Sequence, residues 1–590
     1  METIAQILES RVQSALAGIA DVAVRVNAAA DTRFGDYQTN VAMILANRQK
    51  SKPREVAQQI LDKLDVADIS APPEIAGAGF INFRIKPEWL TGQFARLLAD
   101  SRLGVPAPVR PKKFVIDFSS PNVAKPMHIG HIRSTILGDA LARIAAFVGH
   151  EVVRDNHIGD WGTQFGMLLL GWKTELDRAA LEADPIGEME RIYKLISPKC
   201  DEEKPEFDAA VRTAARQELV KLQAGDAENL SIWHEMQRLS QVQFDAIYSR
   251  LGVRFDVMLG ESFYNPQLKT VVDELRARGI ASESEGALCV FSDGNLKQEE
   301  DPFLIKDKEG WRPNPALVQK SDGGFNYTTT DLATLEYRLK TWSPDEILVL
   351  TDGRQQLHFR QLIAIFRRWH PELADKVRMT HVWFGAILGA DGKPFKTREG
   401  ETVKLAALLD EAVERALALV VEKNPELPDV ERREIARIVG LGAVKYADLL
   451  PNRQSDYVFS WDKMLSFQGN TAPYLQYSYV RIRAIFRKGG EEAGAQKSEV
   501  QLTEPAEFAL AKKLLQFGEV LPQILDDYRP NLLANYLYEL ASTFHGFFES
   551  CPVLKSEPAI RASRLAICDV TASVLRQGLG LLGIEVPERM

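Results

Sequence analysis

The chain has 590 residues and a formal net charge of −9; 45% of its residues are hydrophobic and 26% are charged. This length exceeds what one hydrophobic core supports, so we predict several domains, and the lack of a long uninterrupted apolar run excludes a membrane-spanning helix. The acidic balance argues against a protein that coats nucleic acid nonspecifically, although local basic patches remain compatible with it.

Residues 1–107 are predicted to form a separate α/β domain. The opening METIAQILESRVQSALAGIA carries Glu2, Glu9 and Arg11 where a signal peptide would need a basic start and an apolar run, so we expect an amphipathic helix of the mature protein. The stretch GFINFRI alternates as a strand does. The linker LGVPAPVRPKK, which combines prolines with basic residues, closes this domain.

Residues 108–404 alternate β-rich runs with helical runs, which is typical of a parallel sheet with crossover helices. The β-rich runs are FVIDF, EVVRDNH and DEILVLT, and helical spacing covers 129–148 and 358–369. A polar, strongly helical stretch at about 173–251 interrupts this alternation and is most simply an insertion. We therefore predict an α/β, Rossmann-like catalytic domain that carries a helical insertion.

Residues 405–590 have apolar residues at helical spacing with almost no strand signal, which predicts an all-α helical bundle. The cysteines lie far apart without a CxxC pair, so neither a zinc site nor a disulfide framework is indicated. They are Cys200, Cys289, Cys551 and Cys568. A reducing cytoplasm is therefore the compartment that we expect.

The stretch SSPNVAKPMHIGHIRST, residues 119–135, places two histidines at a strand-to-helix junction. His128 and His131, spaced i and i+3, would project from one face of the first helical turn, beside unpaired backbone N–H groups that attract anions. Gly130 would leave room for a base or ribose. Imidazoles can donate hydrogen bonds to phosphate oxygens without a fixed charge, so the pair predicts a nucleotide phosphate site. A purely structural pair is the alternative.

A second phosphate-directed stretch is GADGKPFKTREGETVKL, residues 389–405. Its glycines predict a mobile loop, and Lys393, Lys396 and Arg398 give this loop cations that could meet a polyphosphate. Alone, such a loop is usually a solvated surface turn. In the same βα domain as the paired histidines, it favours nucleotide chemistry, and the chain has no G-x-x-x-x-G-K-[ST] loop to suggest another phosphate site.

These motifs together resemble those of class I aminoacyl-tRNA synthetases. The tetrapeptide at 128–131 is similar to their HIGH motif, and residues 393–397 are similar to the KMSKS loop in the degenerate form of arginyl-tRNA synthetases, with Pro394 and Phe395 in place of Met-Ser. Further stretches resemble that family in the same order along essentially the whole chain. They are NHIGDWGTQFG, GESFY, YTTTDLA, GRQQLHF and GNTAPYLQYSYVRIR.

The resemblance implies an arginine–tRNA ligase that activates L-arginine with ATP and transfers it to the terminal adenosine of tRNA(Arg), with tRNA generally needed for the first step. It implies His128, His131 and Lys396 as catalytic residues, and Mg²⁺ that accompanies ATP rather than a metal site of the chain. The implied ATP-binding residues are His128, Gly130, His131, Lys125, Lys393 and Lys396.

The amino-acid pocket can also be argued from chemistry. A guanidinium presents several donors in one plane, so its recognition needs carboxylates and planar acceptors at fixed positions. Tyr327 and Asp331 lie i and i+4, and Glu261 follows an apolar run, where open α/β sheets often place site residues. By resemblance, Glu261 and Asp331 would hold the guanidinium beside Tyr327. The α-amino and carboxylate groups would be held by Ser120, Asn122, His131 and Gln355.

The helical C-terminal part mixes tyrosines with arginines, which suits bases that stack and phosphates that pair with cations. The alternative is a helix with a tyrosine core face and a solvated basic face. By resemblance this part would read the anticodon, and residues 1–107 would contact the tRNA elbow. The predicted tRNA-binding residues are Asn470, Tyr474, Tyr477, Arg481 and Arg487. We expect a monomer without membrane contact.

Two other functions stay open at this point. A small-molecule adenylyltransferase could share the histidine helix, but it would not explain the long helical bundle or the N-terminal domain. A catalytically inactive tRNA-binding relative is the non-enzymatic alternative, and the intact His128, His131 and Lys396 argue against it.

Overall fold

The structure, a computed structural model, describes residues 1–590 except 18–20, 30, 32, 374–375, 396–402 and 491–499. It divides into two compact units. One unit contains residues 110–416 and 447–462, and is called the catalytic unit below. The other contains residues 1–109, 417–446 and 463–590, and is called the helical unit below.

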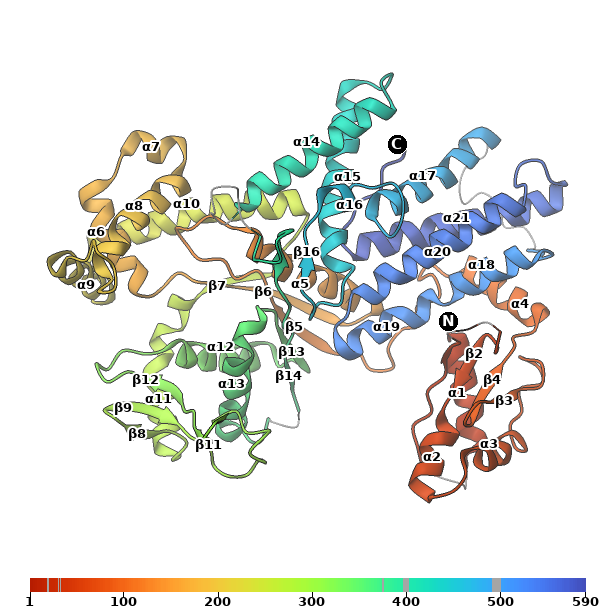
Figure 1. The fold of residues 1–590 in the computed structure, drawn as a ribbon, viewed down its shortest axis with the longest axis horizontal. Helices are drawn as coiled ribbons and strands as arrows, with labels where there is room; N and C mark the ends of the chain where they lie inside the picture. The colour runs from red at the N-terminus through yellow and green to blue at the C-terminus, as the bar shows by residue number, and fades with distance from the viewer. Residues whose placement is uncertain (18–20, 30, 32, 374–375, 396–402, 491–499) are drawn as a thin grey trace. The chain divides into compact units, whose positions relative to one another are not determined.

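The catalytic unit is built on a parallel sheet with the strand order β14-β13-β5-β6-β7 (Figure 1). The strands are β5 (Lys113–Asp117), β6 (Glu151–Ile158), β7 (Val257–Gly260), β13 (Glu346–Val349) and β14 (Arg378–His381). The chain moves from β5 toward β7 in one direction and from β13 to β14 in the other. Open α/β sheets bind ligands where the order reverses in this way, at the carboxyl ends of the strands. The predicted Rossmann-like fold is confirmed.

Helix α5 (Ile129–Val148) follows β5 and packs closely on the chain that precedes it. Most of its residues are buried, as its apolar sequence predicts. A Cβ atom added at Gly138 would lie 2.1 Å from the Phe118 ring, so only a glycine permits this approach. The helix predicted over 129–148 is confirmed.

Helices α11 (Asn265–Ala277), α12 (Tyr327–Trp342) and α13 (Gln356–Trp369) pack around a buried apolar cluster that includes strand residues. The cluster includes Val115, Leu332, Ile347, Ile365 and Trp369. Arg338 on α12 pairs with Asp155 at 2.8 Å and with Asp117 at 2.7 Å. Because these charges are buried and mutually bonded, they fix α12 against β5 and β6 near the ligand-binding edge.

Residues 163–251 leave the sheet between β6 and β7 as a group of helices (Figure 1). They are α6 (Thr163–Glu175), α7 (Arg178–Ala183), α8 (Pro185–Cys200), α9 (Ala209–Gln223) and α10 (Ala227–Leu251). Lys173 donates to Glu218 at 2.8 Å and to Asn229 at 2.6 Å, which ties α6, α9 and α10 together. Burial raises the pKa of Glu218, but hydrogen bonds from Lys173 and Lys221 outweigh it and lower the pKa to about 2.

Short elements complete the catalytic unit. Strands β8 (Ser282–Ser284), β9 (Ala287–Val290) and β12 (Ala316–Gln319) form an antiparallel sheet, and β10 (Leu304–Asp307) pairs with β11 (Gly310–Pro313). The turns η1 (Glu261–Tyr264) and η2 (Gly353–Gln355) follow β7 and β13. Strand β15 (Ile387–Leu388) pairs with β16 (Tyr457–Val458).

The C-terminal part of the helical unit is a bundle that includes α17 (Ala472–Gly489), α18 (Pro505–Leu515), α19 (Phe517–Asp527), α20 (Asn531–Ser550) and α21 (Pro558–Leu581). Three other helices have residues in both units. They are α14 (Leu405–Lys423), α15 (Asp429–Leu449) and α16 (Trp461–Met464).

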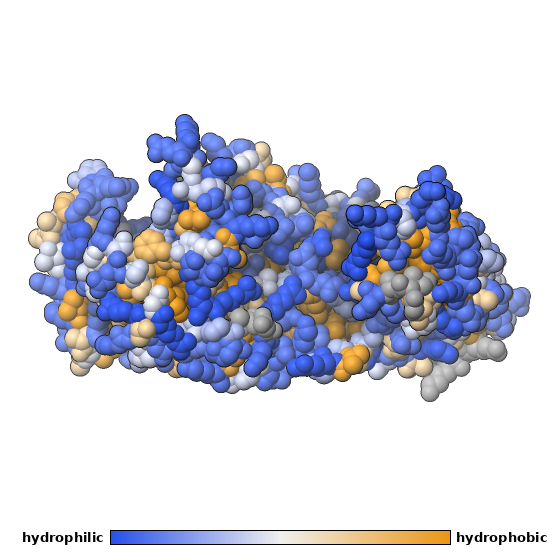
Figure 2. Space-filling model, turned by 90° about the horizontal axis from the view of Figure 1, so that it is seen from below, coloured by the Kyte–Doolittle hydropathy of each residue, from blue (hydrophilic) through white to orange (hydrophobic). Residues whose placement is uncertain are grey.

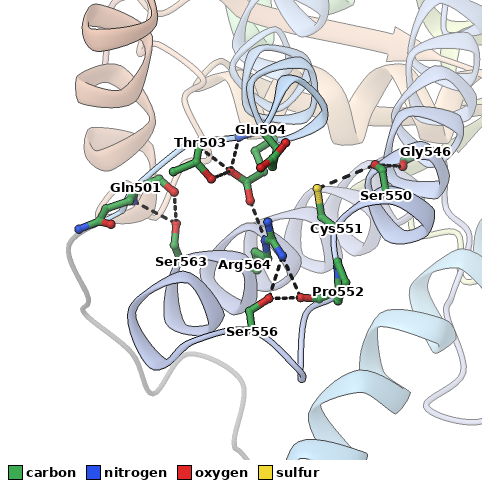
Figure 3. Close-up of polar contacts among 11 residues, drawn as sticks. Gln501, Thr503, Glu504, Gly546, Ser550, Cys551, Pro552, Ser556, Ser563 and Arg564 are labelled. Atoms are coloured by element: carbon green, nitrogen blue, oxygen red, sulfur yellow. Dashed lines mark hydrogen bonds and ion pairs between the residues drawn. The ribbon is translucent and has the colours of Figure 1, made fainter.

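A buried ion pair holds α18 to α21 within this bundle. Arg564 donates from Nε to Glu507 at 2.7 Å. It also donates to the Pro552 carbonyl at 2.9 Å and to Ser556 Oγ at 2.8 Å. Figure 3 shows Arg564 pointing toward Pro552 and Ser556. Because the guanidinium is surrounded by acceptors, removing Glu507 would leave an uncompensated buried charge.

The N-terminal domain of the helical unit packs a small antiparallel sheet with helices. The strands are β1 (Asn27–Ala28), β2 (Tyr37–Thr39), β3 (Glu74–Ala76) and β4 (Phe80–Phe83), in the order β1-β2-β4-β3. The helices are α1 (Ile4–Ala15), α2 (Val41–Gln49), α3 (Pro53–Leu61) and α4 (Pro87–Leu98). The domain docks on α19, where buried Glu519 accepts hydrogen bonds from the Ala5 N–H at 3.1 Å and the Tyr37 hydroxyl at 2.9 Å.

On the face drawn in Figure 2, hydrophobic residues form patches that are separated by hydrophilic ones. Within the described part of the chain, no helix combines the length and the apolar character needed to cross a bilayer. Cys200, Cys289, Cys551 and Cys568 are free thiols.

Candidate active site

The loop between β5 and α5 holds its backbone in an uncommon conformation. Ser119, Ser120 and Ala124 have φ angles of 78°, 49° and 61°, in the left-handed region that residues other than glycine seldom adopt. Side chains of neighbouring elements fix this shape. Ser134 Oγ accepts from the Ser119 N–H at 2.9 Å, and Asn156 Oδ1 accepts from the Ser120 N–H at 3.0 Å. Strain of this kind persists where the surroundings determine the geometry, as they do at functional sites.

Ser120 and Asn122, predicted to bind arginine, both lie on this loop. Ser120 Oγ donates to Asp117 Oδ1 at 3.2 Å. Asn122 forms a bridge with Gly159, which follows β6, and a Cβ atom added at Gly159 would lie 2.2 Å from Asn122 Oδ1. The Asn122 side chain therefore lies directly against the backbone at the carboxyl end of β6.

His128 and His131 lie together at the start of α5, with ring centroids 4.1 Å apart. The Nδ1 atom of His128 accepts from the Gly130 N–H at 3.0 Å, and that of His131 accepts from the His128 N–H at 3.1 Å. Because each Nδ1 is an acceptor, a neutral ring carries its proton on Nε2 and can donate there. A Cβ atom at Gly130 would lie 2.8 Å from His128 Cε1, so the glycine also makes room for this ring.

Burial keeps both imidazoles neutral. Burial, followed by the charge of Lys125, lowers the pKa of His128. Burial, followed by the charge of His128, lowers the pKa of His131 to about 3. At neutral pH the pair therefore offers N–H donors without positive charge, which suits contact with phosphate oxygens.

A cavity of about 520 Å³ opens beside the histidines at the carboxyl ends of β5, β13 and β14. This volume lies within the range of sites that bind small molecules and cofactors, and the position is the point where the strand order reverses. Of the residues predicted to bind ATP, His128 and Gly130 line the cavity, whereas Lys125, His131 and Lys393 do not. Other lining residues include Arg133, Asp352, Arg354, Trp383, Phe384 and Asp456.

Those other lining residues were not predicted from the sequence. Arg354 lies in the stretch GRQQLHF, which resembles the family, so a signal for it was present. Trp383 and Phe384 lie shortly after β14, and only the strand order brings that strand end beside α5.

Lys125 and Lys393, two of the lysines predicted to meet phosphates, lie in separate places. The Nζ atom of Lys125 lies 4.5 Å from the ring centroid of Tyr193 on α8. Lys393 lies in the turn after β15, where its carbonyl accepts from the Gly389 N–H at 2.7 Å. Lys396 lies outside the described residues. The chain then returns to the start of α5, because the Ile129 N–H donates to the Val403 carbonyl at 3.0 Å.

Carboxylates gather at the carboxyl end of β7. Glu261 begins η1, and burial followed by the negative charges of Asp331 and Asp160 raises its pKa to about 7. Asp160 accepts from the Ser262 hydroxyl at 2.6 Å and from Gln237 at 2.7 Å. Among the residues that the structure describes, no lysine or arginine pairs with these three carboxylates. The cluster therefore has the charge that a cationic ligand would neutralise.

The other predicted arginine-binding residues lie at element ends. Tyr327 is the first residue of α12 and is 61% exposed, and Asp331 follows one helical turn later. Gln355 is exposed at the end of η2, which follows β13. His358 Nε2 lies 2.6 Å from Asp331 Oδ2. His358 lies in the stretch GRQQLHF, which resembles the family, but no pattern in the sequence alone indicates its contact with Asp331.

In the helical unit, the predicted tRNA-binding residues surround the start and the outer face of α17. Tyr477 is 40% exposed, and the Arg481 guanidinium lies 5.1 Å from its ring centroid and 5.3 Å from that of Phe548. A cavity of about 330 Å³ lies beside Tyr477. Its lining residues are Val420, Lys423, Asn424, Phe467, Tyr477 and Met590.

The remaining predicted residues of this region have partners within the chain. Tyr474 lies near Tyr538, with ring centroids 5.7 Å apart. Asn470 accepts a hydrogen bond from the Tyr446 hydroxyl at 2.5 Å, and Arg487 donates to the Glu588 carbonyl at 2.9 Å. Among the five predicted residues, Tyr477 and Arg487 are exposed, whereas Arg481 is half-buried and its guanidinium lies 3.2 Å from His545 Nδ1.

The sequence matches three described families along its length. Residues 93–461 match the catalytic domain of class I tRNA synthetases (R), residues 475–590 match the DALR anticodon binding domain, and residues 2–85 match the arginyl tRNA synthetase N terminal domain.

Proteins named arginine–tRNA ligase from Laribacter hongkongensis and Saccharophagus degradans are 46% and 47% identical to this chain over 596 residues, which cover 100% of both partners in each comparison. Among solved structures, the arginyl-tRNA synthetases of Plasmodium falciparum and Thermus thermophilus match with a TM-score of 0.83 over 100% of both chains, at 28% and 26% identity. The chain belongs to the arginyl-tRNA synthetase family.

Proposed function

We propose that this chain ligates L-arginine to the terminal adenosine of tRNA(Arg) in two steps. First, an arginine carboxylate oxygen attacks the α-phosphorus of ATP, forming arginyl-adenylate and releasing pyrophosphate. Then the 2′-hydroxyl of the adenosine attacks the arginyl carbonyl carbon, and AMP leaves. The observation that carries this proposal is the pair of neutral histidines beside a cavity at the strand-order reversal. The same unit holds a carboxylate cluster that no lysine or arginine of the described ranges pairs with.

At the phosphate end, His128 and His131 donate from Nε2 to phosphate oxygens. Their neutrality favours contacts that strengthen as charge develops in the transition state rather than tight binding of ATP itself. Lys396, with Lys393 and Lys125, stabilises the charge that moves onto pyrophosphate. Gly130 keeps the backbone open for the nucleotide.

Mg²⁺ accompanies ATP in this proposal and neutralises phosphate charge. The cavity wall contains the carboxylates of Asp352 and Asp456, whose oxygens are ligands that Mg²⁺ accepts. Within the described ranges, no group of three or more His, Cys, Asp or Glu residues could hold a metal ion. Phosphate oxygens and water would therefore supply most of the ligands.

At the arginine end, Glu261 and Asp331 accept hydrogen bonds from the guanidinium, and Tyr327 covers it. Ser120, Asn122, His131 and Gln355 hold the α-amino and carboxylate groups. The loop after β5 carries Ser120 and Asn122 and leads into the histidine helix. This placement would bring the arginine carboxylate toward the α-phosphate.

We assign tRNA binding to the helical unit. Residues 405–590 would contact the anticodon, with exposed Tyr477 as a stacking group and half-buried Arg481 as the cation beside it. Asn470, Tyr474 and Arg487 would assist them, and residues 1–107 would contact the tRNA elbow. We also propose a monomer in a reducing cytoplasm, which the free cysteine thiols support.

The decisive experiment is ATP–pyrophosphate exchange with each amino acid, with and without tRNA, followed by tRNA aminoacylation. We expect exchange with arginine alone among the amino acids, and only when tRNA is present. Exchange without RNA and with another carboxylic acid would identify an adenylyltransferase. Tight tRNA binding without exchange or aminoacylation would identify an inactive relative.

A further inference from the structure

The Asp331 carboxylate is held by a single histidine. His358, near the start of α13, places Nε2 2.6 Å from Asp331 Oδ2. The His358 side chain is 15% exposed and that of Asp331 is 25% exposed, so the contact is largely shielded from water. Among the residues described, the other oxygen, Asp331 Oδ1, has no hydrogen-bond partner in the chain. One oxygen is therefore fixed and the other is available to a ligand.

The His358 imidazole also contacts Tyr327, another side chain of the proposed guanidinium site. Its ring packs edge-on against Tyr327, with centroids 4.8 Å apart and planes at 69°. The next residue, Phe359, is buried and stacks on His381 at 4.5 Å. The start of α13 is therefore anchored, and His358 meets Asp331 and Tyr327 from a fixed position.

We propose that His358 positions Asp331 for arginine recognition; this inference rests on the proposed function. A guanidinium holds its N–H donors in one rigid plane, so it pairs best with a carboxylate oxygen whose orientation is fixed. By donating to Oδ2, His358 sets the rotation of the Asp331 carboxylate and leaves Oδ1 for the substrate. It touches no reacting atom, so its effect falls on arginine binding and selectivity.

Two amide substitutions separate hydrogen bonding from bulk. In His358→Gln the amide nitrogen is as many bonds from Cα as Nε2, so it can still donate to Asp331. In His358→Asn the amide is one bond shorter and cannot reach. A hydrogen bond to a charged group is worth about 1.5–3 kcal/mol, so we expect His358→Asn to raise the arginine KM about tenfold or more. His358→Gln should stay within about threefold of the unmutated enzyme, since the bond is kept.

The assay is ATP–pyrophosphate exchange with saturating tRNA(Arg), with KM measured separately for arginine and ATP. We expect the ATP KM and kcat to change little in both variants. Citrulline, the neutral isostere of arginine, should be discriminated less well by His358→Asn alone. His370→Leu at the other end of α13 is the matched control, because His370 pairs with Glu372 and Glu336 rather than with the pocket.

A double-mutant cycle covers the case in which His358→Asn is poorly folded. In an Asp331→Asn background there is no carboxylate to orient, so adding His358→Gln or His358→Asn should not raise the arginine KM further. Equal KM values for all His358 variants and the unmutated enzyme, or additive effects in the cycle, would overturn the positioning role alone. An unmutated enzyme that does not use arginine would overturn the proposed function as well.

Discussion

Half-buried Glu261 in the catalytic unit and buried Glu519 in the helical unit are both acids with a pKa raised to about 7. Burial is the main cause for each. They differ in their neighbours: Asp331 and Asp160 add negative charge around Glu261, whereas the Ala5 N–H and the Tyr37 hydroxyl donate hydrogen bonds to Glu519.

A raised pKa therefore does not by itself identify a functional site. Glu519 is a bonded acid at the contact between the N-terminal domain and α19. Glu261 lies among like charges that the described chain does not neutralise, so it gains most from a bound cation. Arginine should therefore change the ionisation of Glu261 and leave that of Glu519 unchanged.

The largest expected effect comes from Asp331→Asn. The substitution keeps shape but removes one charge of a buried pair with the guanidinium, which typically costs about 3 kcal/mol or more, so the arginine KM should rise about a hundredfold. The ATP KM should barely change, and discrimination against citrulline should shrink. Exchange kinetics with both substrates test this. Asp322→Asn, in the exposed turn before α12, is the control, and an unchanged arginine KM in Asp331→Asn would remove this residue from the pocket.

Glu519→Gln tests whether Glu519 is protonated in the folded protein, through its effect on the free energy of unfolding. The pKa of Glu519 in the folded protein, about 7, lies above its ordinary value of 4.5, so the fold favours the protonated acid. Its contribution to the free energy of unfolding is therefore fully present below pH 4.5 and is lost as the pH rises through 7. The neutral amide should therefore stabilise the protein by up to about 3 kcal/mol at pH 8 and have little effect at pH 4.5. Denaturant unfolding at the two pH values measures this. A stabilisation that does not depend on pH would mean that Glu519 is not protonated in the fold.

The arginine KM is expected to change about tenfold between pH 6 and pH 8. Glu261 is mostly neutral at pH 6 and mostly charged at pH 8, and the guanidinium prefers the charged form, so the arginine KM should fall about tenfold over this interval. Glu261→Gln should raise the KM at pH 8 and flatten the profile. Glu519→Gln should leave the profile as in the unmutated enzyme. If both variants kept the slope, another group would be responsible for it.

The smallest expected effect is on tRNA binding, which we assign to the helical unit and not to the catalytic unit. Reversing Arg481 to Glu should weaken tRNA binding several-fold and reduce its salt dependence, because a phosphate contact is lost. The arginine KM at saturating tRNA should not change. Filter binding at several salt concentrations measures the effect, with Arg276→Glu on the exposed face of α11 as a control for loss of positive charge. Unchanged tRNA affinity in Arg481→Glu would place the RNA surface elsewhere.

Several features followed from sequence because they depend on neighbours along the chain. The α/β fold class is confirmed, since strand and helix periodicities are local patterns. The family is confirmed as well, because its motifs are short and ordered. The strand-to-helix junction was sufficient to place His128 and His131 on the first turn of α5. Their catalytic roles, like those of the other predicted site residues, stay predictions.

The tertiary structure decided what depends on segments that are distant in sequence. His358 meets Asp331 from 27 residues away, and the Glu519 side chain meets Ala5 across 514 residues. Trp383 and Phe384 reach the cavity only because the strand order places β14 on the same side of β5 as β13. The pKa shifts also depend on tertiary structure. The pKa of about 3 for His131 and that of about 7 for Glu261 arise mainly from burial. Burial results from packing, which no local stretch of sequence specifies.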